Sequence, residues 1–223
     1  MKIKTILVAS ASVTAIGFTA HSCVALATST VGVAIIKQVL LGGISKGLGV
    51  LKNKDTFKQS DLVEKALPSQ LREINSVLGK IAPSLLEKEK DYIAQAAAYT
   101  ANISEPILTN AVNSLTTDDV TRIAQGGSGM ATQILKEKTS AQLVAAISPK
   151  VDEKLNEFGI VKSINTALKG NNLLGSLLGG NTSNLASGGL SKLASEQIVN
   201  GLFNVVEDYE KQNSQKIFQA LGK

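Results

Sequence analysis

Apolar residues recur every three to four positions along most of the chain, a period typical of amphipathic helices. The first stripe is formed by Ile36, Leu40, Ile44 and Leu48. Glycines between residues 42 and 49 interrupt it and predict either a close approach of a second helix or a frayed helix. No stretch alternates apolar and polar residues for long enough to predict a strand. The pattern therefore predicts an all-α, multi-helix bundle of roughly seven to nine helices. Similar stripes occupy residues 71–81, 84–115 and about 191–221.

Two helix starts are predicted by the spacing of a capping box, in which Ser or Thr is followed three residues later by an acidic residue or Gln. Thr116 and Asp119 have this spacing, and so do Thr139 and Gln142. Gly126 offers the left-handed backbone in which many helices end. These two pairs of capping residues predict separate helices that begin near residues 117 and 140.

Prolines predict further helix boundaries, because proline lacks the amide hydrogen that a helix interior requires. Pro106 is expected to kink or divide the helix over 84–115, with Ser104 as the cap of the second half. Ser148-Pro149 is expected to begin another segment, which Gly159 ends.

The N-terminus has the pattern of a secretory signal peptide, with Lys2 and Lys4 followed by an uncharged apolar run and small residues. One cut site precedes Cys23, in the order small-x-Ser-Cys that a lipoprotein signal peptidase accepts. An A-x-A site that ends at Ala27 is an alternative and would release a soluble secreted protein. An uncleaved anchor over residues 5–36 is a third, although Ser, Thr and Gly dilute its hydrophobicity.

The lipoprotein cut is favoured, because a lone cysteine at the end of an apolar segment is poorly explained otherwise. It predicts a signal peptide over residues 1–22, a tether over 23–34 and a single helical domain over 35–223, with lipidation of Cys23 as the membrane anchor. Apolar rather than acidic residues follow Cys23, which favours the periplasmic side of the outer membrane. Residues 170–190 are rich in Gly, Asn and Ser and are predicted to form a flexible insert.

Export limits the chemistry of the remaining chain. It removes His21, the only histidine, and leaves Cys23, the only cysteine, either lipidated or cut away. This excludes Ser-His-Asp and Cys-His catalysis and metal sites made of His and Cys, so no cofactor is predicted. Loss of Lys2 and Lys4 lowers the net charge from +5 to +3, which is too small to indicate a nucleic-acid partner.

Two groups of carboxylates invite a catalytic interpretation, but helix structure explains each of them. Asp118 and Asp119 stand at a predicted helix start, where the helix dipole attracts negative charge. Glu87, Glu89 and Asp91 alternate with lysines, which predicts a solvated helix face.

Two further stretches are candidates for binding. "GGSGMAT" over residues 126–132 lacks the Gly-Lys-[Ser/Thr] ending of a phosphate loop, so Ser128 is expected simply to cap the next helix. Tyr92 and Tyr99 are seven residues apart and share a helix face, so they could line a groove for an apolar ligand. Close packing of a helix through the alanines of "AQAAAY" is the alternative.

Five stretches, in order along about residues 35–223, are "GISKGLGVLKNKDTF", "ALPSQLREINSVLGKI", "LTTDDVTRIAQGG", "MATQILKEKTSAQL" and "SEQIVNGLFNVVEDYEK". Together they resemble the domain of unknown function 4197, a family of uncharacterised bacterial envelope proteins. The chain departs from that family at Ile134-Leu135, where an aromatic pair is usual, and over "IVKSINTALKG". Many members look like lipoproteins, so the resemblance supports lipidation of Cys23. It implies no activity.

Three functional hypotheses follow from the sequence. The favoured one is a non-enzymatic, lipid-anchored envelope protein that has a structural role or binds a protein or an apolar ligand. The second is a carboxylate-dependent hydrolase that uses Asp119 or its neighbours with a borrowed metal. The third is a soluble secreted binder cleaved after Ala27.

Overall fold

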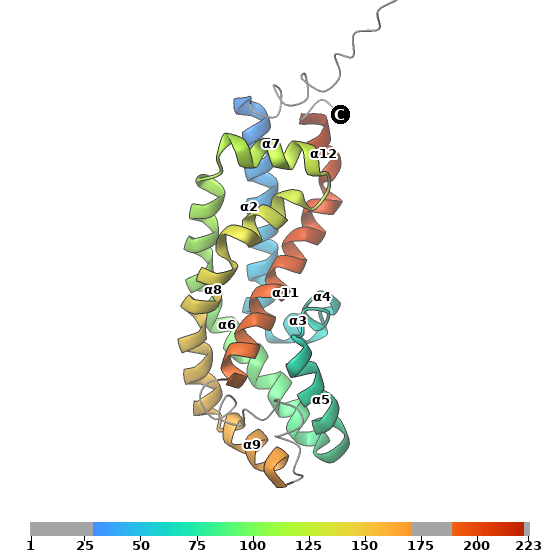
Figure 1. Ribbon diagram of the computed structural model, residues 1–223, viewed down its shortest axis with the longest axis vertical. Helices are drawn as coiled ribbons and strands as arrows, with labels where there is room; N and C mark the ends of the chain where they lie inside the picture. The colour runs from blue at the N-terminus through green and yellow to red at the C-terminus, as the bar shows by residue number, and fades with distance from the viewer. Residues whose placement is uncertain (1–28, 171–188, 221–223) are drawn as a thin grey trace, which may run out of the picture.

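The protein is all-α, as the apolar periodicity predicts (Figure 1). The computed structural model describes residues 29–170 and 189–220, and every regular element in these ranges is a helix. The predicted signal peptide, Cys23 and most of the predicted insert over 170–190 lie outside the described residues. The helices are α2 (Thr30–Lys52), α3 (Lys54–Gln59), α4 (Asp61–Glu64), α5 (Ser69–Ile81), α6 (Pro83–Asn113), α7 (Thr117–Gly126), α8 (Met130–Glu157), α9 (Ile160–Gly170), α11 (Leu190–Gln212) and α12 (Ser214–Ala220).

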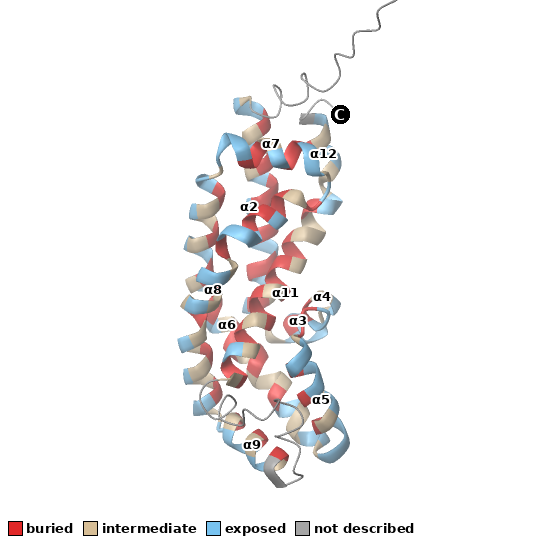
Figure 2. Ribbon diagram, viewed as in Figure 1, coloured by how far each residue is buried: buried red, intermediate tan, exposed pale blue. Residues whose placement is uncertain are grey.

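Four long helices, α2, α6, α8 and α11, form an elongated bundle (Figure 1). Each packs against two others in the cycle α2–α6–α8–α11. Figure 2 shows that the buried residues of these helices face the interior, whereas exposed residues cover the outside. The short helices lie at the ends and on one flank, with α7 and α12 at one end and α5 and α9 at the other (Figure 1).

Helix α2 packs against α11 through its glycines. A Cβ atom added at Gly43 would lie 3.2 Å from the backbone oxygen of Val206, and one added at Gly47 would clash with the side chain of Leu202. The interpretation of these glycines as sites of close helix approach is therefore confirmed. The apolar stripe of α2 is also buried in the bundle.

By length and composition alone, α2 could cross a membrane, with a mean hydropathy of 1.4. Its place near the N-terminus is also compatible with a signal segment and export. A buried core helix has the same composition, and Ile36, Leu40, Ile44 and Leu48 are all buried in the bundle. The helix begins at Thr30, where Ser29 accepts a hydrogen bond from the N–H of Gly32 at 3.1 Å, so the last residues of the predicted tether are helical.

Neither internal proline divides its helix, so the boundary predicted at Pro149 and the division expected at Pro106 are wrong, whereas the alternative of a kink at Pro106 stays a prediction. A proline inside a helix costs about 3 kcal/mol. Full burial of one Leu, Ile or Val side chain contributes about 1.5–3 kcal/mol. Each helix buries two such residues within six positions of its proline, which is enough to outweigh the cost. These residues are Leu108 and Val112 in α6, and Val151 and Leu155 in α8.

The residues predicted to cap these segments lie in helix interiors. The hydroxyl of Thr139 is buried and donates to the carbonyl of Leu135 at 2.7 Å, and Gln142 is exposed in the middle of α8. The caps predicted at Thr139 and Gln142 are therefore wrong, because α8 runs unbroken through them. Ser104 and Ser148 likewise donate to carbonyls four residues earlier in their helices, at 3.0 and 2.6 Å.

Two other predicted boundaries are confirmed, whereas one predicted helix is divided. Gly159 has a φ of 67° and separates α8 from α9. Helix α7 ends at Gly126, although the left-handed residue is the next one, Gly127, with a φ of 81°. The helix predicted over about 191–221 is divided at Asn213 into α11 and α12.

Candidate functional site

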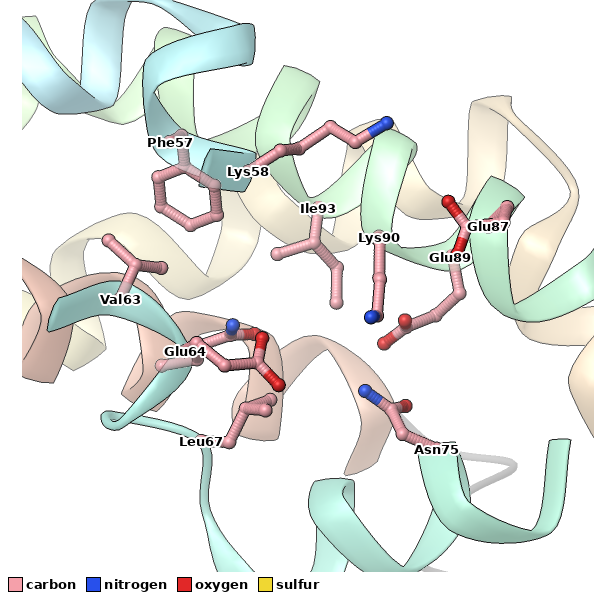
Figure 3. A pocket seen from close by; sticks show the side chains of 11 residues that line it. Phe57, Lys58, Val63, Glu64, Leu67, Asn75, Glu87, Glu89, Lys90 and Ile93 are labelled. Carbon is pink, nitrogen blue, oxygen red and sulfur yellow. The ribbon is translucent and has the colours of Figure 1, made fainter. Parts of the chain in front are cut away.

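A cavity of about 150 Å³ lies where five helices, α3, α4, α5, α6 and α11, meet near one end of the bundle (Figure 3). Its floor is apolar and is formed by buried residues. Its rim carries the exposed side chains of Lys58, Glu64 and Glu87, so the cavity opens to the surface between charged groups. The apolar floor residues are Phe57, Val63, Leu67 and Ile93.

Glu89 of α6 lies inside this cavity with only 1% of its surface exposed. Neither of its carboxylate oxygens has a hydrogen-bond partner among the described residues. The prediction that Glu89 belongs to a solvated helix face is therefore wrong. Glu89 is four residues before Ile93 and eight before Ala97, so it continues the buried face of α6 rather than the charged one.

Two amide side chains from other helices add oxygen atoms to the same cavity. Asn75 of α5 and Gln197 of α11 each place a buried side-chain oxygen there, and neither oxygen has a partner among the described residues. Figure 3 shows Asn75 and Glu89 pointing toward one another from α5 and α6. Buried polar atoms are nearly always paired, so four unpaired oxygens around one cavity are unusual.

Burial determines the protonation of Glu89. Loss of solvation raises its pKa from 4.5 to about 8, and the rim carboxylates Glu64 and Glu87 act in the same direction, whereas Lys90 opposes them. The carboxyl group is therefore mostly neutral at pH 7 when the cavity contains no cation. Because a neutral carboxyl can lose its proton to a partner, the site can change its charge on binding.

Polar contacts fix the helices that surround the cavity. Asp91, two residues after Glu89, pairs with Lys54 and Lys58 of α3 at 2.5 and 2.7 Å. Burial alone would raise the pKa of Asp91, but the hydrogen bonds from both lysines lower it below its usual value. The side-chain amide of Asn204 in α11 donates to the carbonyl of Leu62 in α4 at 2.8 Å.

The chemistry available in the cavity is hydrogen bonding and charge, and its unused acceptors are the four buried oxygens without a partner among the described residues. Among the described residues, no group of three His, Cys, Asp or Glu side chains is placed to hold a metal ion. Glu89 is the one buried acid of the cavity, and the two other polar groups with buried unpaired oxygens are neutral amides. The arrangement suits a ligand that donates hydrogen bonds.

The capping box predicted at Thr116 and Asp119 is confirmed. The Asp119 carboxylate accepts from the N–H and the hydroxyl of Thr116 at 2.8 and 2.9 Å, and Lys138 lies 2.9 Å from the same oxygen. Burial tends to raise the pKa of Asp119, but the hydrogen bonds from Thr116 and Lys138 lower it below its usual value. Asp119 is thus occupied by structural contacts, which do not favour a role as a hydrolytic acid or base.

The start of α8, within the "GGSGMAT" stretch, is capped by a residue remote in sequence. Ser128 does not cap it, because the N-cap residue is Gly129 and makes no side-chain cap bond. Instead the buried carboxylate of Glu210 in α11 accepts from the backbone N–H groups of Gly129, Ala131 and Thr132, at 2.9, 3.2 and 2.7 Å. The anion position of this helix start is therefore filled by the protein itself.

Tyr92 and Tyr99 have different partners. The Tyr92 ring is stacked on Phe158 with 4.5 Å between ring centroids. Tyr99 is 51% exposed, and the ammonium groups of Lys154 and Lys150 lie 4.7 and 5.8 Å from its ring centroid. The cavity described above is lined by neither ring.

Comparison with known proteins places the chain in a family. The family described as "Protein of unknown function (DUF4197)" matches residues 26–220, which is nearly the whole chain and includes all the described helices. No curated protein and no solved structure matches the chain. The cavity and its residues are thus assigned from geometry alone. The chain belongs to the DUF4197 family of proteins of unknown function.

Proposed function

We propose that this protein is an exported, lipid-anchored envelope protein that acts as a non-catalytic binding module, with the cavity around Glu89 as its ligand site. The observation that carries the proposal is the set of four buried oxygens of Glu89, Asn75 and Gln197 around one cavity, none of which has a partner in the part of the chain that the structure describes. Leaving a buried polar group unpaired costs about 1–3 kcal/mol. Several unpaired polar groups around one cavity are consistent with a ligand that supplies the missing hydrogen-bond donors.

The sequence supports a binding role over a catalytic one. The only histidine and the only cysteine lie within the first 23 residues, in the segment that has the pattern of a signal peptide. Lipid attachment at Cys23 would hold the bundle at the membrane on the periplasmic side. From there the cavity would be available to small molecules of the periplasm.

The ligand site is tested by a thermal-shift screen on the full lipidated protein in mild detergent. The panel contains small amines, carboxylates, alcohols and amides. We expect at least one class to raise the melting temperature of the wild type but not of Glu89→Leu, which places an apolar side chain in the cavity. A panel in which no class stabilises the wild type would contradict the binding function.

The anchor is tested separately by mass spectrometry of the N-terminal peptide. Lipidation predicts a peptide that begins at Cys23 and carries acyl groups, and membrane association that Cys23→Ser abolishes. An unmodified peptide that begins at Thr28 would show cleavage after Ala27 and a soluble secreted protein instead.

A further inference from the structure

The unpaired atoms of the cavity determine which hydrogen-bonding groups a complementary ligand must carry. Once Glu89 is ionised, its two oxygens, Oδ1 of Asn75 and Oε1 of Gln197 are all hydrogen-bond acceptors. An anion or a carbonyl would add further acceptors and leave these four oxygens without partners. The complementary ligand therefore carries several N–H donors.

The charges at the rim favour a positive ligand. Glu64 and Glu87 are exposed at the cavity mouth, and each opposes ionisation of Glu89, as one negative charge opposes another. Lys58, the rim lysine on α3, is already paired with Asp91 at 2.7 Å, and Lys90 on α6 is the opposing charge. A cation that enters would be attracted by the two rim carboxylates, would be repelled by Lys90, and would pair with Glu89 by replacing the proton that Glu89 holds.

The size and floor of the cavity limit the cation. Its volume of about 150 Å³ exceeds the ~30 Å³ that one water molecule occupies in the liquid, so a group of several heavy atoms fits. The apolar floor, which includes Phe57 and Ile93, can cover methylene groups. A bare divalent metal ion fits less well, because Ca²⁺ requires six to eight oxygen ligands and Mg²⁺ six in octahedral geometry.

Resting on the proposed binding function, we propose that the cavity binds a small organic cation whose ammonium or guanidinium N–H groups donate to Glu89, Asn75 and Gln197. The alkyl part of such a ligand lies on the apolar floor. Glu89 is ionised in the complex, and its proton is released to solvent.

The test is calorimetric titration of the full-length protein at pH 7 with putrescine, a short diamine. Two matched controls have the same carbon chain length but other end groups: 1,4-butanediol is neutral and succinate is anionic. We expect putrescine to bind one to one and neither control to bind. Because Glu89 is mostly protonated beforehand, most of one proton is released, which titrations in phosphate and in HEPES buffer measure.

Matched variants on the same helix locate the binding. Glu89→Gln keeps the size of the side chain but removes the charge, so we expect the affinity for putrescine to fall about 10–100-fold. Glu87→Gln removes an exposed rim carboxylate, and we expect a change of at most about threefold. Proton release in the wild type tests the role of Glu89 even if Glu89→Gln folds poorly.

Three results would overturn the inference. Equal affinity of wild type and Glu89→Gln would place the amine elsewhere, and absence of putrescine binding would mean that the cavity does not accept a short organic cation. Binding of the diol or succinate that Glu89→Gln abolishes would show that the cavity is a binding site for another class of ligand. In that last case the proposed binding function is kept, whereas the inference that the ligand is a cation is rejected.

Discussion

Glu89 and Glu210 are both buried glutamates with 1% of their surface exposed, yet their surroundings are opposite. Glu210 accepts three backbone N–H bonds at the start of α8, so each of its oxygens has a partner. Glu89 has none among the described residues and faces a cavity. A buried carboxylate is thus used in two ways in this bundle: Glu210 holds the fold together, and Glu89 is left available to a ligand.

The largest effect is expected when Glu210, the structural member of the pair, is removed. Glu210→Ala removes the acceptor of three buried N–H groups, and we expect the free energy of unfolding to fall by about 3–5 kcal/mol. Urea denaturation at pH 7 measures it. The matched control is Glu207→Ala, which removes a half-buried glutamate of the same helix that pairs with Lys211. A similar small loss in both variants would show that the Glu210 contacts contribute little.

The second prediction concerns pH. Folding raises the pKa of Glu89 from 4.5 to about 8, so the native state binds more protons than the unfolded state between these values. The contribution of Glu89 to stability is therefore full below pH 4.5 and is lost as the pH rises to 8, by about 1.4 kcal/mol per pH unit. Denaturation curves across this range should lose that slope in Glu89→Gln and retain it in Glu87→Gln.

If the difference between wild type and Glu89→Gln is the same at pH 5 and at pH 8, Glu89 does not titrate as a buried, unpaired acid. The measurement is made without added amine, because a bound cation would lower the pKa of Glu89 and mask the slope.

The third prediction concerns the amide oxygens of the cavity. Gln197→Met replaces an unpaired buried oxygen by an apolar group of similar shape, and we expect a gain in stability of about 1 kcal/mol. Asn204→Leu on the same helix breaks a bond to Leu62, and we expect a loss of about 1 kcal/mol. Chemical denaturation measures the free energy of unfolding of both variants. A gain indicates a polar group that is retained for a ligand, and a loss indicates one that stabilises the fold. Destabilisation by Gln197→Met would place Gln197 with the structural residues.

The smallest effect is expected at the local cap of α7, which joins neighbouring residues, unlike the remote cap formed by Glu210. Thr116→Ala removes the capping box of α7, and we expect a loss of about 1 kcal/mol. Gln142→Ala, at the rejected cap inside α8, should change stability by less than about 0.5 kcal/mol. Thermal unfolding of the two variants measures the difference, and an equal loss in both would show that the capping box of Thr116 contributes no more than an exposed position inside a helix.

These contrasts explain which features the sequence predicts. Helical stripes and the Thr116–Asp119 cap depend on residues a few positions apart, so periodicity and spacing reveal them. The contact between Glu210 and Gly129 joins residues 81 positions apart, and no local pattern indicates it. The boundaries expected at Pro106 and Pro149 fail because tertiary burial outweighs a local penalty.

The cavity could be predicted only in part. Extending the buried stripe of α6 back from Ile93 by one turn reaches Glu89, which signals a buried acid among exposed charges. The neighbouring lysines hide this signal, because charge alternation is also typical of a solvated face. Asn75 and Gln197 come from two other helices, so their convergence with Glu89 depends on the packing of the bundle and not on spacing.

The most direct test of the central claim is the pKa of Glu89 itself, measured by NMR from the pH dependence of its side-chain carboxyl carbon. Burial without partners predicts a value of about 8 in the free protein, and a marked decrease when putrescine is added. An ordinary value near 4.5 in the free protein would contradict the account, because it would mean that Glu89 is solvated or already paired.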